Sequence, residues 1–271
     1  MNMRSSRASC VVVLALCAAC RAPNAGDATV VAKPADAHAP LERRTLAVPA
    51  STCVLEFVRV PAPQPFWIGT TEIPWDAFDV YVYKTDAPAG SAVDAVTRPS
   101  QPYNPMDRGF GHAGHPALSM SLKSAQGFCV WLSAHTGKHF RLPTEAEWEL
   151  AARAGDTRAR PDDAELAASA WLAENSGART HPFEMLRANA YGMHDVFGNA
   201  GEWCLAPDGT GVLRGGSYLT PRAELRYDTR LADTPAWNRR DPQIPKSVWW
   251  LIDGGFAGLR IVCDDEPAAT R

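Results

Sequence analysis

The spacing of apolar residues predicts two helices in the middle of the chain. One lies between Ser121 and His135 and should end at Gly137; its apolar positions recur every three or four residues, at Leu122, Ala125, Phe128, Cys129 and Leu132. The other lies within Arg141–Gly155, where Thr144 and Glu147 have the spacing of a capping box.

Alternation of apolar and polar residues predicts strands earlier in the chain. Val54–Val60 alternates and is rich in β-branched residues, and Phe66–Thr70 and Val80–Tyr83 are two further short candidates. By contrast, Asn189–Trp203 contains too many Asn, Gly and Asp residues for a helix or a simple strand. We expect an ordered loop there.

Residues 1–19 have the pattern of an export signal. Basic residues precede the apolar stretch Val11–Leu16, and Ala18 and Ala19 stand directly before Cys20. This order resembles the bacterial lipoprotein signal, in which Cys20 becomes the lipidated N-terminus, although Cys17 replaces the usual leucine. We expect an exported protein, either an outer-membrane lipoprotein or periplasmic. A soluble secreted form is the alternative.

Composition divides the rest of the chain into a tether, one domain and a tail. Residues 20–52 are rich in Ala and Pro and lack aromatic residues, which predicts a flexible tether; residues 53–265 form the domain and 266–271 the tail. Nine Trp, nine Phe and six Tyr supply side chains for a core. The net charge of −3 gives no sign of a nucleic-acid-binding surface.

Four motifs follow one another in a recognisable order: RLPTEAEWELAARAG from Arg141, NAYGMHDVFGNAGEW from Asn189, RGGSY from Arg214 and GLRIV from Gly258. Together they resemble the sulfatase-modifying-factor domain, the family of the formylglycine-generating enzymes. The resemblance covers about Glu56 to Asp265. It implies a loop-rich α+β fold of the C-type-lectin-like kind, with two main helices against a twisted antiparallel sheet.

The resemblance also implies a structural calcium site. The matching positions are Asp195, Gly198, Ala200 and Glu202, which would supply two carboxylates and two backbone carbonyls. Calcium requires several oxygen ligands, and a bound ion would explain what orders this loop. The alternative is that Asp195 caps a turn and Glu202 pairs with an arginine.

The catalytic positions of the family's oxidases are where this sequence departs from them. Those enzymes bind copper through two cysteines that follow RGGS, and the matching positions here are Thr220 and Leu225, neither of which offers a thiolate. Ser217 matches a family active-site serine, but Gly201 stands where tryptophan is usual. We do not expect copper, and whether the protein is an enzyme stays open.

Four cysteines lie in the expected domain: Cys53, Cys129, Cys204 and Cys263. An even number in an exported protein is typical of disulfides. The resemblance favours the pair Cys129–Cys263. The alternative is that the cysteines are separate buried thiols.

Aromatic and basic residues gather near the end of the domain, at Trp237, Arg239, Trp249 and Trp250. They could form a groove for a peptide or a glycan, or they could close a loop-rich core. Our leading hypothesis is a lipid-anchored domain that lacks the copper-binding cysteines and binds an exported peptide, glycan or protein partner. The alternatives are an enzyme that modifies exported proteins through a non-standard active site, and a structural envelope protein.

Overall fold

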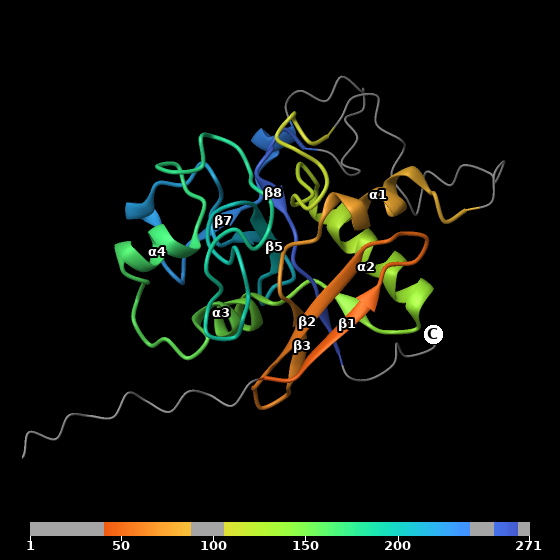
Figure 1. The fold of residues 1–271 in the computed structure, drawn as a ribbon, viewed down its shortest axis with the longest axis horizontal. Helices are drawn as coiled ribbons and strands as arrows, with labels where there is room; N and C mark the ends of the chain where they lie inside the picture. The colour runs from red at the N-terminus through yellow and green to blue at the C-terminus, as the bar shows by residue number, and fades with distance from the viewer. Residues whose placement is uncertain (1–40, 88–105, 239–251, 265–271) are drawn as a thin grey trace, which may run out of the picture. The chain divides into compact units, whose positions relative to one another are not determined.

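The computed structural model describes residues 41–87, 106–238 and 252–264, which contain two β-sheets and four α-helices joined by loops (Figure 1). The first sheet has the order β1-β2-β3-β9-β4 and is antiparallel; its strands are Arg43–Ala47, Val54–Val60, Phe66–Gly69, Val262–Cys263 and Phe140–Arg141. The second sheet has the order β7-β6-β5-β8, with strands Arg230–Ala232, Gly211–Arg214, Gly201–Leu205 and Ala257–Gly258. Only β5 and β8 are parallel among these pairs. The class is α+β, with two sheets where one was expected.

The helices are α1 (Trp75–Tyr83), α2 (Leu122–Thr136), α3 (Glu145–Arg153) and α4 (Asp163–Ser169), and two short 3₁₀ turns cover Arg222–Glu224 and Pro235–Asn238. Both predicted helices are confirmed. Ser121 caps α2 by accepting a hydrogen bond from the Ser124 amide. The Thr144 side chain accepts from the Glu147 amide and the Glu147 side chain accepts from the Thr144 amide, so α3 begins with the predicted capping box.

The strand predicted at Val80–Tyr83 is wrong, because these residues end α1. Pro74 precedes the helix in an extended conformation, and Lys84 ends it in the left-handed region. Six of its nine residues are buried, so most of the surface of this helix packs into the core. The two strands predicted before it are confirmed as β2 and β3.

The folded unit begins earlier than expected. Strand β1 lies inside the range predicted as tether and pairs with β2, from Arg43 opposite Val58 to Ala47 opposite Val54. The Arg44 guanidinium lies 4.2 Å from the centre of the Trp67 ring, so a basic side chain contributes packing area. The tether prediction therefore fails for residues 43–47.

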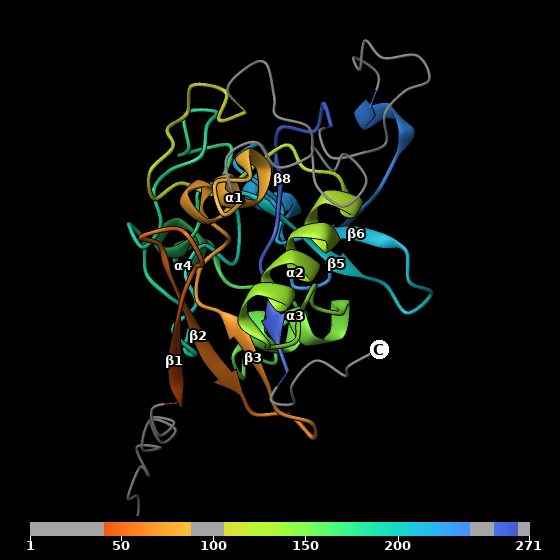
Figure 2. The same ribbon diagram turned by 90° about the vertical axis from the view of Figure 1, so that its right-hand side faces the viewer.

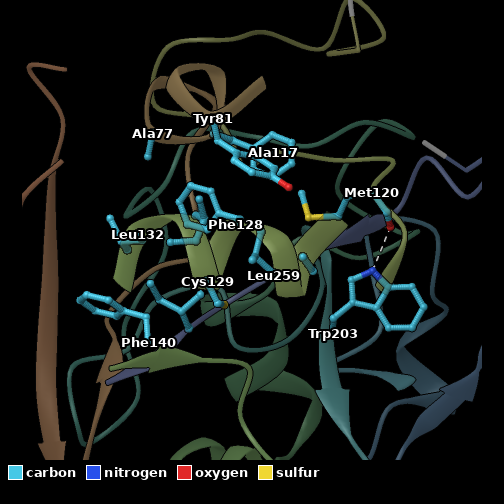
Figure 3. Close-up of a cluster of buried hydrophobic side chains, with 14 of the residues drawn as sticks. Ala77, Tyr81, Ala117, Met120, Phe128, Cys129, Leu132, Phe140, Trp203 and Leu259 are labelled. Carbon is cyan, nitrogen blue, oxygen red and sulfur yellow. Dashed lines mark hydrogen bonds between the residues drawn. The ribbon is translucent and has the colours of Figure 1, made fainter. Parts of the chain in front are cut away.

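Aromatic residues of α1 and α2 pack closely: the ring centres of Phe78 and Phe128 lie 5.5 Å apart. Figure 2 shows the two helices side by side. Figure 3 shows Phe128, Cys129 and Leu132 projecting from α2 into the same cluster. In that cluster the Trp203 indole N–H donates to the Met120 carbonyl at 2.9 Å, which satisfies its buried polar group. No helix in the described ranges has the length and hydropathy of a membrane span.

Candidate functional site

Hydrogen bonds to distant segments hold the loop before β5. The Asn199 amide donates to the Trp171 carbonyl at 2.9 Å, and the Gly198 amide donates to the Gly215 carbonyl at 3.0 Å. Gly198 has a φ of +77°, and a Cβ added there would lie 2.1 Å from the Trp171 oxygen, so only glycine fits. The predicted ordered loop is confirmed up to Ala200, after which the chain forms β5.

Glu202 in β5 is neutralised by Arg260, and both side chains are completely buried. The Arg260 Nη2 donates to Glu202 Oε1 at 2.7 Å, and its Nε lies 3.0 Å from both carboxylate oxygens. The Trp148 indole N–H donates to Oε2 at 2.6 Å. Three N–H groups therefore point at a carboxylate that offers about four lone-pair sites, so most of the acceptor capacity of Glu202 is used. The arginine pairing left open by the sequence is therefore present.

Two more buried carboxylates lie near this pair. Glu72 is fully buried, and its Oε1 accepts from the Ala200 amide at 3.0 Å. Asp195 is 2% exposed; its Oδ2 accepts from the Glu184 amide at 3.4 Å, whereas its Oδ1 has no hydrogen-bond partner among the described residues. Burial raises the pKa of Glu72 well above its ordinary value, and the charge of Asp195 adds to the shift. Burial also raises the pKa of Asp195, to about 6.

Some oxygen atoms of this cluster are placed to coordinate a hard cation such as calcium, and others are not. The Asp195 Oδ1 is a buried oxygen without a partner. The Asn199 amide donates to the Trp171 carbonyl, and the Gly201 amide donates to the Phe256 carbonyl. In a trans peptide the N–H and the preceding C=O point in opposite directions. The carbonyls of Gly198 and Ala200 therefore point away from these two partners. Glu202 fits less well, because Arg260 and Trp148 already use most of its acceptor capacity. Across the described residues, no three His, Cys, Asp or Glu side chains are arranged to hold a metal ion, so a cation here would depend on backbone oxygens as well.

Thr220 and Leu225, at the positions of the family's copper ligands, both have structural roles here. The Thr220 Oγ1 accepts from the Ser217 amide at 2.9 Å, and the Ser217 Oγ accepts from the Leu219 amide at 3.2 Å. Leu225 is fully buried in the second core cluster. Neither Thr220 nor Leu225 fits soft-metal coordination.

Gly201 is closely approached by two carbonyl groups. A Cβ added there would lie 3.1 Å from the Gly216 oxygen and 3.4 Å from the Phe256 oxygen. The Gly201 amide also donates to the Phe256 carbonyl at 2.7 Å. The tryptophan usual in the family's enzymes would therefore require this part of the backbone to move.

Arg214, the first residue of RGGSY, fastens β6 to α3. Its guanidinium contacts Glu145 at 3.0 Å and Glu149 at 2.9 Å, and lies 5.1 Å from the centre of the Trp148 ring. Only 4% of the side chain is exposed. The motif's arginine thus has a structural explanation that requires no substrate.

The expected Cys129–Cys263 disulfide is absent. The four cysteines of the described residues are free thiols, and Cys129 and Cys263 both belong to the first core cluster. Burial raises the pKa of Cys129 to about 12, so its thiol is protonated at neutral pH. The Cys263 Sγ donates to the Asp264 carbonyl at 3.4 Å. Both side chains are accommodated as small hydrophobic groups.

Of the predicted ligand surface, the described residues include Trp237. Its ring centre lies 5.9 Å from that of Trp203 and 5.4 Å from that of Phe256, so it packs partly against the core. Arg239, Trp249 and Trp250 lie outside the described residues, as does Cys20. Trp237 therefore belongs partly to the core.

A pocket of about 280 Å³, lined in part by Asp195, opens between the end of α3, α4 and residues 187–197. Several of its charged groups are paired with one another. Arg158 donates to Asp156 and Glu165 at 2.8 and 2.9 Å, and the Tyr227 hydroxyl donates to Asp156 at 2.8 Å. These contacts stabilise the turn that leads into α4.

The α+β arrangement and the motif loops define the class as a sulfatase-modifying-factor-type domain. The sequence matches the family described as "Sulfatase-modifying factor enzyme 1-like domain" over residues 55–241, and the chain belongs to that family. It is 29% identical over 211 residues to the formylglycine-generating enzyme of Streptomyces coelicolor, covering 64% of this chain and 58% of that protein. It is 34% identical over 147 residues to the serine/threonine-protein kinase pkn1 of Chlamydia caviae, covering 46% of this chain and 22% of that protein. The chain thus spans less than two thirds of the length of either relative.

Solved structures support the fold. Treponema denticola variable protein 1 matches with a TM-score of 0.59 and 20% identity, covering 82% of this chain and 98% of that one. PvdO from Pseudomonas aeruginosa matches with a TM-score of 0.54 and 22% identity, covering 83% of this chain and 92% of that one. At these identities the likeness concerns the fold alone.

Among the site residues, Glu72 was missed by the sequence analysis. It lies 128 positions before its backbone partner Ala200, and it belongs to none of the four motifs. A single glutamate inside the otherwise apolar and hydroxylated stretch from Ile68 to Trp75 was the available signal.

Proposed function

We propose that this protein is an exported, lipid-anchored binding domain with a C-type-lectin-like fold that does not generate formylglycine by the copper route. The observation that carries the proposal is the structural role of the two residues at the copper-ligand positions. Thr220 closes a hydrogen-bonded turn, and Leu225 is buried in the core. The four described thiols lie outside the segment after RGGS; Cys129, Cys204 and Cys263 are buried and Cys53 is partly buried, and none belongs to a group of three possible metal ligands among the described residues.

The ligand is an exported peptide, glycan or protein that contacts the loops after RGGSY. Leu219 is 48% exposed directly after Tyr218, and Trp237 presents part of its indole nearby in the chain. Arg239, Trp249 and Trp250 follow later in the sequence and are part of the same proposed ligand surface. Large aromatic side chains and arginine are the residue types that dominate binding interfaces. Lipid attachment at Cys20 would hold the domain at a membrane surface.

Calcium is the proposed structural ion, with Asp195, Gly198, Ala200 and Glu202 as the ligands implied by the family. The unpartnered Asp195 Oδ1 supports this proposal. The ion would hold the loop before β5 in place and neutralise buried carboxylates, and it would take no part in chemistry.

The oxidase alternative is tested by incubating the purified protein with copper(I), oxygen and a cysteine peptide of the sulfatase type, with mass spectrometry of the peptide. We expect no aldehyde, while the Streptomyces coelicolor enzyme serves as the positive control. Formylglycine formation by the wild-type protein would contradict the proposal.

The binding role is tested on glycan and peptide arrays. Leu219→Asp should abolish any signal, because it places a charge on the proposed surface. Val130→Asp is the matched control, since Val130 is 70% exposed on α2. Equal binding by both variants would exclude this surface, and the absence of any wild-type signal would favour a structural envelope role.

A further inference from the structure

The pocket between α3, α4 and residues 187–197 has apolar walls. Four buried side chains of the second core cluster line it, each at most 8% exposed: Met193, Val196, Phe197 and Tyr227. Alanines at positions 152, 154, 188 and 190 also line it, and their small side chains leave room. An engineered apolar cavity of about 150 Å³ binds benzene. A pocket of about 280 Å³ can therefore take a ring that carries an ionised substituent.

Two of the three arginines that line the pocket are already neutralised. The Arg153 guanidinium donates to Glu149 Oε1 at 2.8 Å and to the Arg158 carbonyl at 2.7 Å. Arg158 donates in turn to Asp156 and Glu165, at 2.8 and 2.9 Å. Neither guanidinium has a positive charge left for a ligand.

Arg187 is the third arginine of the pocket and differs from the other two. Its backbone amide donates to the Ala168 carbonyl at 2.9 Å, but its exposed guanidinium has no hydrogen bond or ion pair among the described residues. A guanidinium presents paired N–H donors that match the two oxygens of a carboxylate. The pocket thus combines buried apolar walls with one positive charge that nothing in the described fold neutralises.

One free positive charge matches a ligand with one negative charge. A phosphate monoester carries about two negative charges at neutral pH. The second charge would be repelled by Asp195, a buried carboxylate that lines the same pocket. A carboxylate avoids this cost, and an apolar body gains free energy by leaving water for the pocket walls.

We propose that this pocket binds a small monocarboxylate whose apolar body is about the size of a phenyl ring. The carboxylate pairs with Arg187 at the exposed end, and the body packs against Met193, Phe197 and Tyr227. The inference goes beyond the proposed function, because it needs neither the surface at Leu219 and Trp237 nor a bound calcium ion.

Isothermal titration of phenylacetate into the purified full-length protein, at a fixed calcium concentration, tests the proposal. Phenylacetamide has nearly the same shape and no charge, and it is the ligand control. We expect phenylacetate to bind and phenylacetamide to bind more weakly, on the order of tenfold, because the amide cannot form the charge-assisted pair.

Three variants locate the site. Arg187→Gln should weaken phenylacetate binding on the order of tenfold and leave phenylacetamide binding unchanged. Arg179→Gln is the matched control, because Arg179 is also exposed and does not line the pocket. Ala190→Trp adds a bulky side chain at an exposed position of the lining and should weaken both ligands.

The proposal is overturned if the wild-type protein does not bind phenylacetate at millimolar concentration, or binds both ligands equally. Tighter binding of phenyl phosphate than of phenylacetate would contradict the choice of a monocarboxylate. Equal weakening by Arg187→Gln and Arg179→Gln would show that the anion binds outside this pocket.

Discussion

Glu202 and Arg260 form a buried ion pair between β5 and the segment leading into β9, with 2.7 Å between Oε1 and Nη2. Arg260 also donates to the carbonyls of Gly69 at 3.0 Å and His194 at 2.8 Å. One side chain therefore links the first sheet, the motif loop and the second sheet. Without it, Glu202 would be an uncompensated charge close to Glu72 and Asp195.

Arg260→Met should lower the free energy of unfolding by about 3–5 kcal/mol, the range for breaking a buried pair by removing one partner. Urea denaturation at neutral pH measures it. Arg43→Met is the matched control, because the Arg43–Glu56 pair is exposed and such pairs contribute about 0–1 kcal/mol. Similar losses for both variants would contradict the structural role assigned to Arg260.

Thr144→Ala should lower the free energy of unfolding by about 1 kcal/mol through loss of the α3 cap. The Thr144 side chain accepts from the Glu147 amide at 3.2 Å, and the Glu147 carboxylate accepts from the Thr144 amide at 2.8 Å. Thr157→Ala, at an exposed position after the helix, is the control and should be near neutral. Thermal melting of both variants decides the question, and a neutral Thr144→Ala would show that the cap contributes little.

Asp156 should stabilise the fold at neutral pH and lose this effect in acid. Hydrogen bonds from Arg158 lower the pKa of Asp156 to about 2, despite opposing desolvation. Because the folded pKa lies below the ordinary value of about 3.8, the stabilisation is present above that value and disappears as pH falls towards 2. Asp156→Asn should therefore cost about 1 kcal/mol at pH 7 and clearly less at pH 2, where the carboxyl is about half protonated, measured by urea denaturation, with exposed Asp233→Asn as control. A cost independent of pH would refute the assignment.

The core thiols should resist alkylation until the protein unfolds. Burial raises the pKa of Cys129 and Cys263, and only the thiolate is reactive. Treatment with iodoacetamide at pH 8 without reductant should leave both residues unmodified in the native state and modify both in denaturant. A disulfide-linked peptide containing Cys129 and Cys263 would instead restore the pairing that the family resemblance implied.

Local signals predicted the parts of the fold that local interactions determine. The α3 helix was predictable because Thr144 and Glu147 lie three residues apart and cap each other. The end of α1, Val80–Tyr83, was assigned as a strand because its residues are all apolar or aromatic, and a short apolar run does not distinguish a strand from a buried helix. Strand β1 was missed because its Arg-rich sequence becomes a strand by pairing with β2.

The sequence predicted only those residues of the candidate site that lie within one motif. Asp195, Gly198, Ala200 and Glu202 lie within eight consecutive residues, so the sequence identified them together. Their partners are distant: Arg260 is 58 residues after Glu202, and Glu72 is 128 residues before Ala200. Which carboxylate is satisfied and which is free depends on tertiary contacts that no spacing rule contains.

Elemental analysis of the exported, untagged protein by mass spectrometry is the most direct test of a binding domain with a structural ion. We expect about one calcium per chain and no stoichiometric copper. Copper at about one per chain would contradict it, because it would require a metal site formed without cysteines at positions 220 and 225.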